Sequence, residues 1–195
     1  MVKEIKSVQV NLWDEVVGYI ALADNGIPQF EYDPKFKKKG LEISPIELPL
    51  ATTVIYTQQS KATSLHGLPA VIADSLPDRF GMRVIEDFYR TKYNLEKHEV
   101  DIIKRLLYVG KRGIGALEFI PSTHGDDDPL KDQYLEIQNL RKEVKKTIEG
   151  KADVVTAQMM RVGGSAGGAQ AKALVDYNPD NQIIKSGFSE VSEGF

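Results

Sequence analysis

The chain has 195 residues, of which 42% are hydrophobic, and a formal net charge of −3 at pH 7. This composition excludes a disordered chain, fits one large or two small domains, and provides no overall attraction to nucleic acid or anionic lipid. The chain contains no cysteine, which excludes disulfides, thiolate metal sites and a cysteine nucleophile. Because it has neither an apolar run of about 18 residues nor a signal peptide, we expect a cytoplasmic protein without a membrane span.

The N-terminal residues predict an antiparallel β unit. Apolar and polar residues alternate over 5–12, and a second apolar segment covers 16–22. The acidic pair Asp14-Glu15 between them predicts the tight turn of a hairpin. After a turn at Asn25-Gly26, alternating aromatic residues at 30 and 32 predict a third strand.

Two further segments belong to the same β unit. We interpret the basic run KFKKKG, residues 35–40, as a solvated loop in preference to a phosphate-binding patch. Residues 41–57 contain Pro45 and Pro49, which favour extended segments over a helix.

Residues 66–121 predict a helical layer followed by a strand. Pro69 can occupy the first turn of one helix, and Pro77-Asp78 can begin a second, whose buried stripe consists of Val84, Ile85 and Phe88. A further helix is predicted over 95–110, with Val100, Ile103 and Leu107 on one face and Gly110 as its end. The apolar residues of 115–121 predict a strand packed on these helices.

The remaining residues predict a second domain. The polar stretch 122–129 is a linker candidate, and apolar residues recurring every three or four positions over 130–150 predict an amphipathic helix. Strands are expected at 171–177 and 183–187, joined by the turn NPDNQ. We therefore predict an α+β fold with domains 1–123 and 124–195.

The glycine-rich stretch RVGGSAGGAQAKALV, residues 161–175, is the least ordinary in the chain. Its glycines have the spacing of a phosphate-binding P-loop, but Ala169 and Gln170 stand where that motif requires Lys and Ser/Thr. A kinase-type loop that joins two strands over a nucleotide fits the following strand better. A bent connection without a ligand fits equally well, and Ser165 is either a modification site or simply a small residue.

No assembled catalytic or metal site is visible in the sequence. The histidines at 66, 98 and 124 lie in different segments and lack the spacing of a helical metal pair. The run GDDDP, residues 125–129, lacks the alternating ligands of a calcium loop. Asp78 can cap the helix that follows it, and Arg79 can pair with Asp78 or with a partner's acid.

Three phrases in this order resemble HipA-type proteins, the kinase toxins of HipBA-like toxin–antitoxin systems: HGLPAVIADSLPDRFG (66–81), GKRGIGALEFIP (110–121) and GGSAGGAQAKALV (163–175). The resemblance implies an N-terminal subdomain that leads into the start of a kinase-like N-lobe. It implies a nucleotide-phosphate loop in which Ser165 is the autophosphorylated, regulatory residue. The loop comprises Gly163, Gly164, Ser165, Ala166, Gly167 and Gly168.

The resemblance also implies partners and cofactors. Family members use ATP and Mg²⁺, phosphorylate a translation component that is typically an aminoacyl-tRNA synthetase, and bind a helix-turn-helix antitoxin of the HipB type. Contact with DNA is then indirect, through the antitoxin. A homodimer is a further possibility, since incomplete strands can pair with another copy.

The chain departs from the family pattern in two ways. Many relatives carry Arg-Pro-Lys where this chain has Gln170, Ala171 and Lys172. Family kinases are also about twice as long, and their catalytic and metal-binding aspartates follow the region matched here. We interpret Lys185 as solvent-facing, because it precedes the expected position of the ATP-contacting lysine. The expectation is the N-terminal portion of a kinase toxin, inactive alone and without tight nucleotide binding; the alternative is a non-enzymatic subunit that binds a separate kinase core or an antitoxin.

Overall fold

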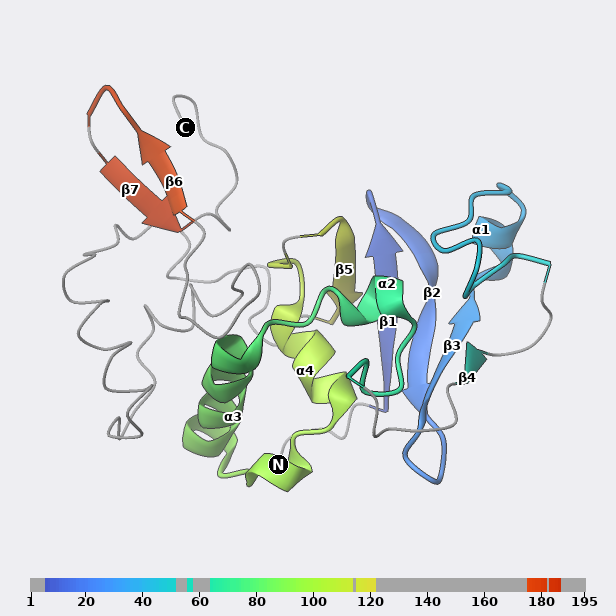
Figure 1. Cartoon of the computed structure of the whole chain (residues 1–195), viewed down its shortest axis with the longest axis horizontal. Coiled ribbons are helices and arrows are strands. Elements are labelled where there is room, and N and C mark those ends of the chain that lie inside the picture. Colours follow the sequence, from blue (N-terminus) through green and yellow to red (C-terminus); the bar gives the residue numbers. More distant parts are fainter. Residues whose placement is uncertain are drawn as a thin grey trace. The chain divides into compact units, whose positions relative to one another are not determined.

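The computed structural model describes residues 6–51, 56–57, 64–113, 115–121, 175–181 and 183–186. The chain divides into two compact units (Figure 1). The first comprises Met1–Leu76 and Asp101–Thr123, and the second Pro77–Val100 and His124–Phe195. Both helices and antiparallel strands are present, which confirms the predicted α+β class. The domain boundary at residue 123 stays a prediction, because 122–174 lie outside the described residues.

The first unit is built on a five-stranded antiparallel sheet with the order β4-β3-β2-β1-β5. Three strands follow one another along the chain, whereas β5 comes from the end of the unit and pairs with the free edge of β1. The strands are β1 (Ser7–Leu12), β2 (Glu15–Leu22), β3 (Pro28–Tyr32), β4 (Tyr56–Thr57) and β5 (Leu117–Ile120).

The β1–β2 hairpin is confirmed, but its turn lies one residue earlier than predicted. Leu12 pairs with Glu15, so Trp13 and Asp14 form the two-residue loop. Their φ angles of 51° and 63° suit a type I′ turn, whose twist matches that of the strands. A bulge makes this turn possible: Val10 pairs with Gly18 and Asn11 with Val16, so β2 has one extra residue.

The basic run after β3 is not simply a solvated loop, and this prediction was wrong in one respect. Residues Pro34–Lys37 form a short helix, α1, whose N-terminus is capped by the Asp33 carboxylate through the backbone N–H groups of Lys35 (2.7 Å) and Phe36 (3.4 Å). Phe36 is buried, and its ring stacks on Tyr32 with centroids 5.9 Å apart. Because lysines flank Phe36 in the sequence, the pattern of charges predicted a solvated loop and not a buried side chain.

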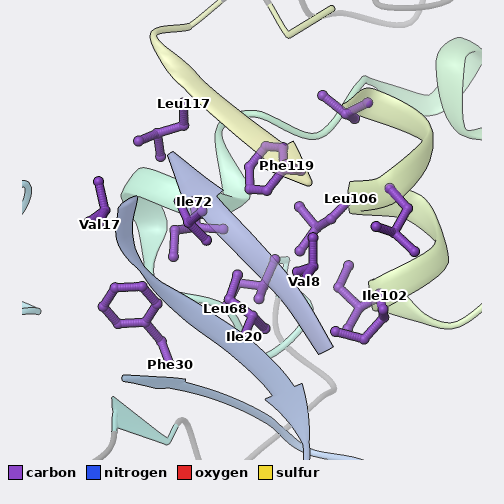
Figure 2. Close-up of a cluster of buried hydrophobic side chains, with 14 of the residues drawn as sticks. Val8, Val17, Ile20, Phe30, Leu68, Ile72, Ile102, Leu106, Leu117 and Phe119 are labelled. Atoms are coloured by element: carbon purple, nitrogen blue, oxygen red, sulfur yellow. The ribbon is translucent and has the colours of Figure 1, made fainter. Parts of the chain in front are cut away.

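The core of the first unit lies against one face of the sheet (Figure 2). Helix α4 (Ile102–Val109) contacts β1, β2 and β5, and α2 (Ala70–Ala73) adds the buried Ile72. Complete burial of a Leu, Ile or Phe side chain contributes about 1.5–3 kcal/mol, so these residues hold helices and sheet together. The fully buried members labelled in Figure 2 include Val8, Ile20, Leu68, Ile72, Leu106 and Phe119.

The other face of the sheet is polar. Gln9 pairs with Tyr19, which in turn pairs with Glu31, so these three side chains form a row across three strands. Tyr19 keeps 43% of its surface exposed. Alternation of apolar and polar residues along the strands therefore separates a packed face from an open one.

The second unit contains α3 (Arg79–Tyr93), which begins and packs as predicted. Its capping residue is Asp78, and Val84, Ile85 and Phe88 are buried. Asn94 ends the helix with φ 54°, a left-handed conformation that asparagine tolerates.

The single helix predicted over 95–110 is wrong, because the segment is divided. A 3₁₀ turn, η1 (Lys97–Glu99), precedes Val100, whose ψ of 80° is not helical. Helix α4 then begins afresh at its cap Asp101, whose carboxylate accepts from the backbone N–H of Lys104 at 2.9 Å. The predicted end at Gly110 is confirmed.

Near the C-terminal end of the chain, β6 (Val175–Asn178) and β7 (Ile183–Ser186) form an antiparallel hairpin, as expected for the two predicted strands. The Asn178 side chain accepts from the backbone N–H groups of Asp180 (2.9 Å) and Asn181 (3.3 Å), which stabilises the turn. Lys185 lies in β7. The predicted helix at 130–150 falls outside the described residues.

Candidate functional site

The glycine-rich loop predicted to bind phosphate lies outside the described residues, as do Lys172 and His124. The assignments to Gly163–Gly168 and Ser165 therefore stay predictions. Two of the three family-like phrases are described in full or nearly so, and their local structure shows why they have these residue types.

The first phrase begins with a tight turn at His66 and Gly67. Both have positive φ angles, 55° and 82°, and the backbone N–H of Leu68 donates to the carbonyl of Leu65 at 2.9 Å. Glycine suits this geometry, because it has no Cβ to clash in the left-handed region. The turn places Leu68 in the core with no exposed surface. The start of the phrase therefore has a structural role.

Helix α2 follows at once, and its N-terminus is satisfied from a distant segment. Its cap residue, Pro69, makes no side-chain capping bond. Instead, the Glu47 carboxylate accepts from the backbone N–H of Ala70 at 2.6 Å. Sequence reasoning missed Glu47, because nothing local links it to a helix that begins 23 residues later.

A shallow, open hollow of about 450 Å³ lies beside α2. Its lining residues are Ser64, Leu65, Ala70, Val71, Ala73 and Asp74. These residues include one carboxylate and one hydroxyl, so they lack the paired acid and base that group transfer requires.

His66 is the histidine nearest to this hollow along the chain, and the folded structure lowers its pKa. Burial lowers the pKa of its imidazole, and the positive charge of Arg105 lowers that pKa further. Both causes favour the neutral ring. His66 therefore resists protonation in the folded protein, whereas His98 lies exposed in η1.

The second phrase forms the turn between α4 and β5. Gly110 has φ 54°, and its carbonyl accepts from the backbone N–H of Phe119 at 3.0 Å. Arg112 donates from Nη2 to the Tyr108 carbonyl at 2.9 Å and lies 5.0 Å from the centroid of the Tyr108 ring. Gly110 thus bonds to one residue on the outer side of β5, the edge strand of the sheet.

Asp78 and Arg79 end the first phrase, at the start of α3. The Asp78 Oδ1 atom accepts from the backbone N–H groups of Phe80 and Gly81, both at 3.0 Å. The predicted capping role of Asp78 is confirmed, while the Arg79 side chain lies exposed.

Across the ranges that the structure describes, no group of three or more His, Asp or Glu residues is placed to hold a metal ion. No described helix has both the length and the apolar character needed to cross a membrane.

One exposed feature lies outside the family-like phrases. Trp13 at the tip of the β1–β2 hairpin keeps 73% of its surface exposed. Large exposed aromatic side chains are common anchors of protein interfaces. The signal in the sequence was an aromatic residue directly beside a predicted turn, where glycine or asparagine is usual.

Comparison with known proteins identifies the family of the chain. A family model described as the HipA N-terminal domain matches residues 8–120, which is more than half of the chain. No curated protein matches the sequence. The matched range runs from the second residue of β1 to the last residue of β5, and it includes both described phrases except Pro121. The family implies a toxin–antitoxin context with HipB. The chain therefore belongs to the HipA family, and residues 8–120 are its HipA N-terminal domain.

Proposed function

We propose that this HipA-type region serves a serine/threonine protein kinase toxin, to which it contributes the glycine-rich regulatory loop but not the catalytic residues. The match of residues 8–120 to the HipA N-terminal domain carries the proposal. The loop 163–168 supports it, because it follows that domain in the order seen in HipA-type proteins. Kinase activity then requires residues that this chain does not contribute.

Ser165 is the proposed site of regulation. The flanking glycines let backbone N–H groups approach a phosphate, and they allow the loop to change conformation. Phosphorylation adds about −1.5 to −2 charges at pH 7, which is enough to reorganise a small loop. We propose that the phosphorylated loop leaves the nucleotide site and that the kinase is then inactive.

ATP and Mg²⁺ are the proposed cofactors of the complete kinase. Mg²⁺ would neutralise the charge that develops on the transferred phosphate. The described residues provide no cluster of carboxylates suited to that ion, so none of them is assigned a role toward it. We expect this chain alone to bind Mg-ATP weakly.

The proposed partners follow the family. A HipB-type helix-turn-helix antitoxin would bind the toxin and connect it to DNA. The proposed substrate of the complete kinase is an aminoacyl-tRNA synthetase. Homodimer formation stays a prediction, and sedimentation velocity of the purified chain tests it.

The decisive experiment separates the loop from the catalytic core. The chain is incubated with Mg-ATP, alone and with a separately purified HipA-type kinase core, and Ser165 is examined by mass spectrometry. We expect phosphorylation only when the core is present, and its loss in Ser165→Ala but not in Ser189→Ala. Magnesium-dependent phosphorylation of Ser165 by the chain alone would contradict the proposal, as would a core that leaves Ser165 unmodified.

The second candidate is a non-enzymatic subunit that binds and regulates a separate kinase core or an antitoxin. The exposed Trp13 favours it, because an interaction module needs an exposed anchor. The two functions differ in how the core is encoded. A separate reading frame that begins with the core supports the subunit, and one continuous frame through Phe195 supports the kinase.

A further inference from the structure

Trp13 combines two features that folding alone does not favour. Its φ angle of 51° is unusual for a bulky residue, since asparagine and glycine fit type I′ turns far better. Its side chain is also 73% exposed, so the indole adds little to the core. Strained backbone and exposed aromatic surface both concentrate where proteins bind partners.

A lysine-rich segment lies beside this tip. Lys39 Nζ forms an ion pair with Glu15 Oε1, the residue that closes the turn. Helix α1 contacts β2, and it lies at the same end of the sheet as the hairpin tip (Figure 1). Lys35 and Lys38 are exposed there, in a chain whose net charge is negative.

We propose that this end of the sheet is a docking surface for a second protein, which accepts the Trp13 indole in an apolar pocket with an acidic rim. The hairpin-tip surface consists of Trp13, Lys35 and Lys38, and the ion pair of Lys39 with Glu15 lies at its edge. The indole supplies buried apolar area, and the lysines attract and orient the acidic rim. This inference is independent of kinase activity and of Ser165.

The charges next to the indole favour a protein over a nucleic acid. Asp14 and Glu15 follow Trp13 directly and are exposed. A nucleic acid strand stacked on the indole would bring its phosphates against these carboxylates, which would repel them. Sites that bind such strands instead place cationic side chains along the phosphate backbone. A protein can instead place its acidic groups opposite Lys35 and Lys38 and leave Asp14 in solvent.

Site-specific cross-linking identifies the partner. The photoreactive residue p-benzoylphenylalanine replaces Trp13 in the full chain, and in a control replaces Ile46, which is 94% exposed in the same unit. We expect a nuclease-resistant adduct with one protein at position 13 that is absent at position 46. An adduct sensitive to nuclease, an adduct with another copy of the chain, equal labelling at both positions, or none would overturn the proposal.

The cross-linked protein is then purified and titrated against the chain. Trp13 is the only tryptophan, so its emission reports on the proposed site, and we expect a shift to shorter wavelength on binding. By calorimetry, Trp13→Asn should weaken binding by about tenfold or more, while Ile46→Asn leaves it unchanged. Lys35→Glu combined with Lys38→Glu should also weaken binding. An affinity unaffected by Trp13→Asn would show that the partner docks elsewhere.

Loss of binding is separated from misfolding by improving the turn. The pair Trp13→Asn and Asp14→Gly restores the preferred type I′ sequence, so we expect a higher melting temperature together with lost binding. A variant that is less stable than the parent would show that the indole serves the fold, and would remove the basis of the proposal.

Discussion

The Glu47 carboxylate accepts a hydrogen bond from the backbone N–H of Ala70 at 2.6 Å and so caps a helix 23 residues further along the chain. Two further hydrogen bonds hold the segment that carries Glu47. The Tyr32 hydroxyl donates to the Leu48 carbonyl at 2.8 Å, and Glu42 accepts from the backbone N–H of Leu50 at 3.1 Å. The 41–50 segment and the first family-like phrase therefore support each other.

Removing this cap should destabilise the first unit. We expect Glu47→Ala to cost about 1 kcal/mol, the usual value for a lost helix cap, and Glu47→Gln to cost less because its amide oxygen still accepts. Urea unfolding followed by circular dichroism measures both. Glu31→Ala, an exposed position on the polar sheet face, is the matched control, and an equal loss there would contradict the capping role.

A methyl group at Gly18 should be far more damaging. A Cβ atom there would lie 2.3 Å from the Glu31 carbonyl oxygen and 2.9 Å from the Phe30 ring. The oxygen belongs to the neighbouring strand, so relief requires movement of the backbone. We expect Gly18→Ala to cost about 3 kcal/mol or more, or to prevent folding.

Gly115→Ala is the control for Gly18, because no atom lies within 4 Å of a Cβ placed there. It should be neutral or stabilise the fold by up to about 1 kcal/mol, since alanine restricts the unfolded chain. Chemical denaturation of both variants tests the contrast. A tolerated alanine at position 18 would show that β2 and β3 are further apart than the structure places them.

The α3 cap predicts a graded series at Asp78. The carboxylate accepts two backbone N–H groups, so Asp78→Ala should cost about 1–2 kcal/mol, whereas Asp78→Asn retains one acceptor and should cost less. Loss of helical circular dichroism on heating reports the effect. Asp74→Ala is the control, because Asp74 lies at the C-terminal end of α2. It should change stability by no more than about 0.5 kcal/mol.

His66 should make stability depend on pH. Burial and Arg105 lower its pKa in the folded state, so around the ordinary histidine pKa the unfolded chain binds more protons. Stability from this group is therefore complete above pH about 6.5 and declines as the pH falls below it. His66→Asn, which tolerates the positive φ of this turn, should flatten the dependence between pH 7 and pH 5.

The control for this experiment is His98→Asn. The change that it causes in the pH dependence of stability is subtracted from the change caused by His66→Asn. Urea midpoints at several pH values provide the measurement. A profile that keeps its full slope in His66→Asn would assign the pH dependence to other groups.

Local signals in the sequence were sufficient for several elements. The β1–β2 and β6–β7 hairpins follow from alternating residues around turn formers, and α3 follows from Asp78 and the stripe of Val84, Ile85 and Phe88. Hydrogen bonds and periodic patterns within a few residues encode these elements, so no tertiary information is needed. The ordered phrases likewise identified the HipA family, and the family model agrees. The roles of Ser165 and its glycines remain predictions from the same phrases.

The tertiary structure decided what depends on distant partners. Phe36 becomes a buried anchor only because Tyr32 and the sheet lie beside it. Strand β5 pairs with β1, and Glu47 accepts a hydrogen bond from Ala70, through contacts that no local sequence pattern encodes. The same packing leaves Trp13 exposed in a turn that is closed by Glu15, the residue that pairs with Lys39. Residue type and spacing thus determined the family and the local elements, whereas burial and long-range pairing created the docking surface that we propose.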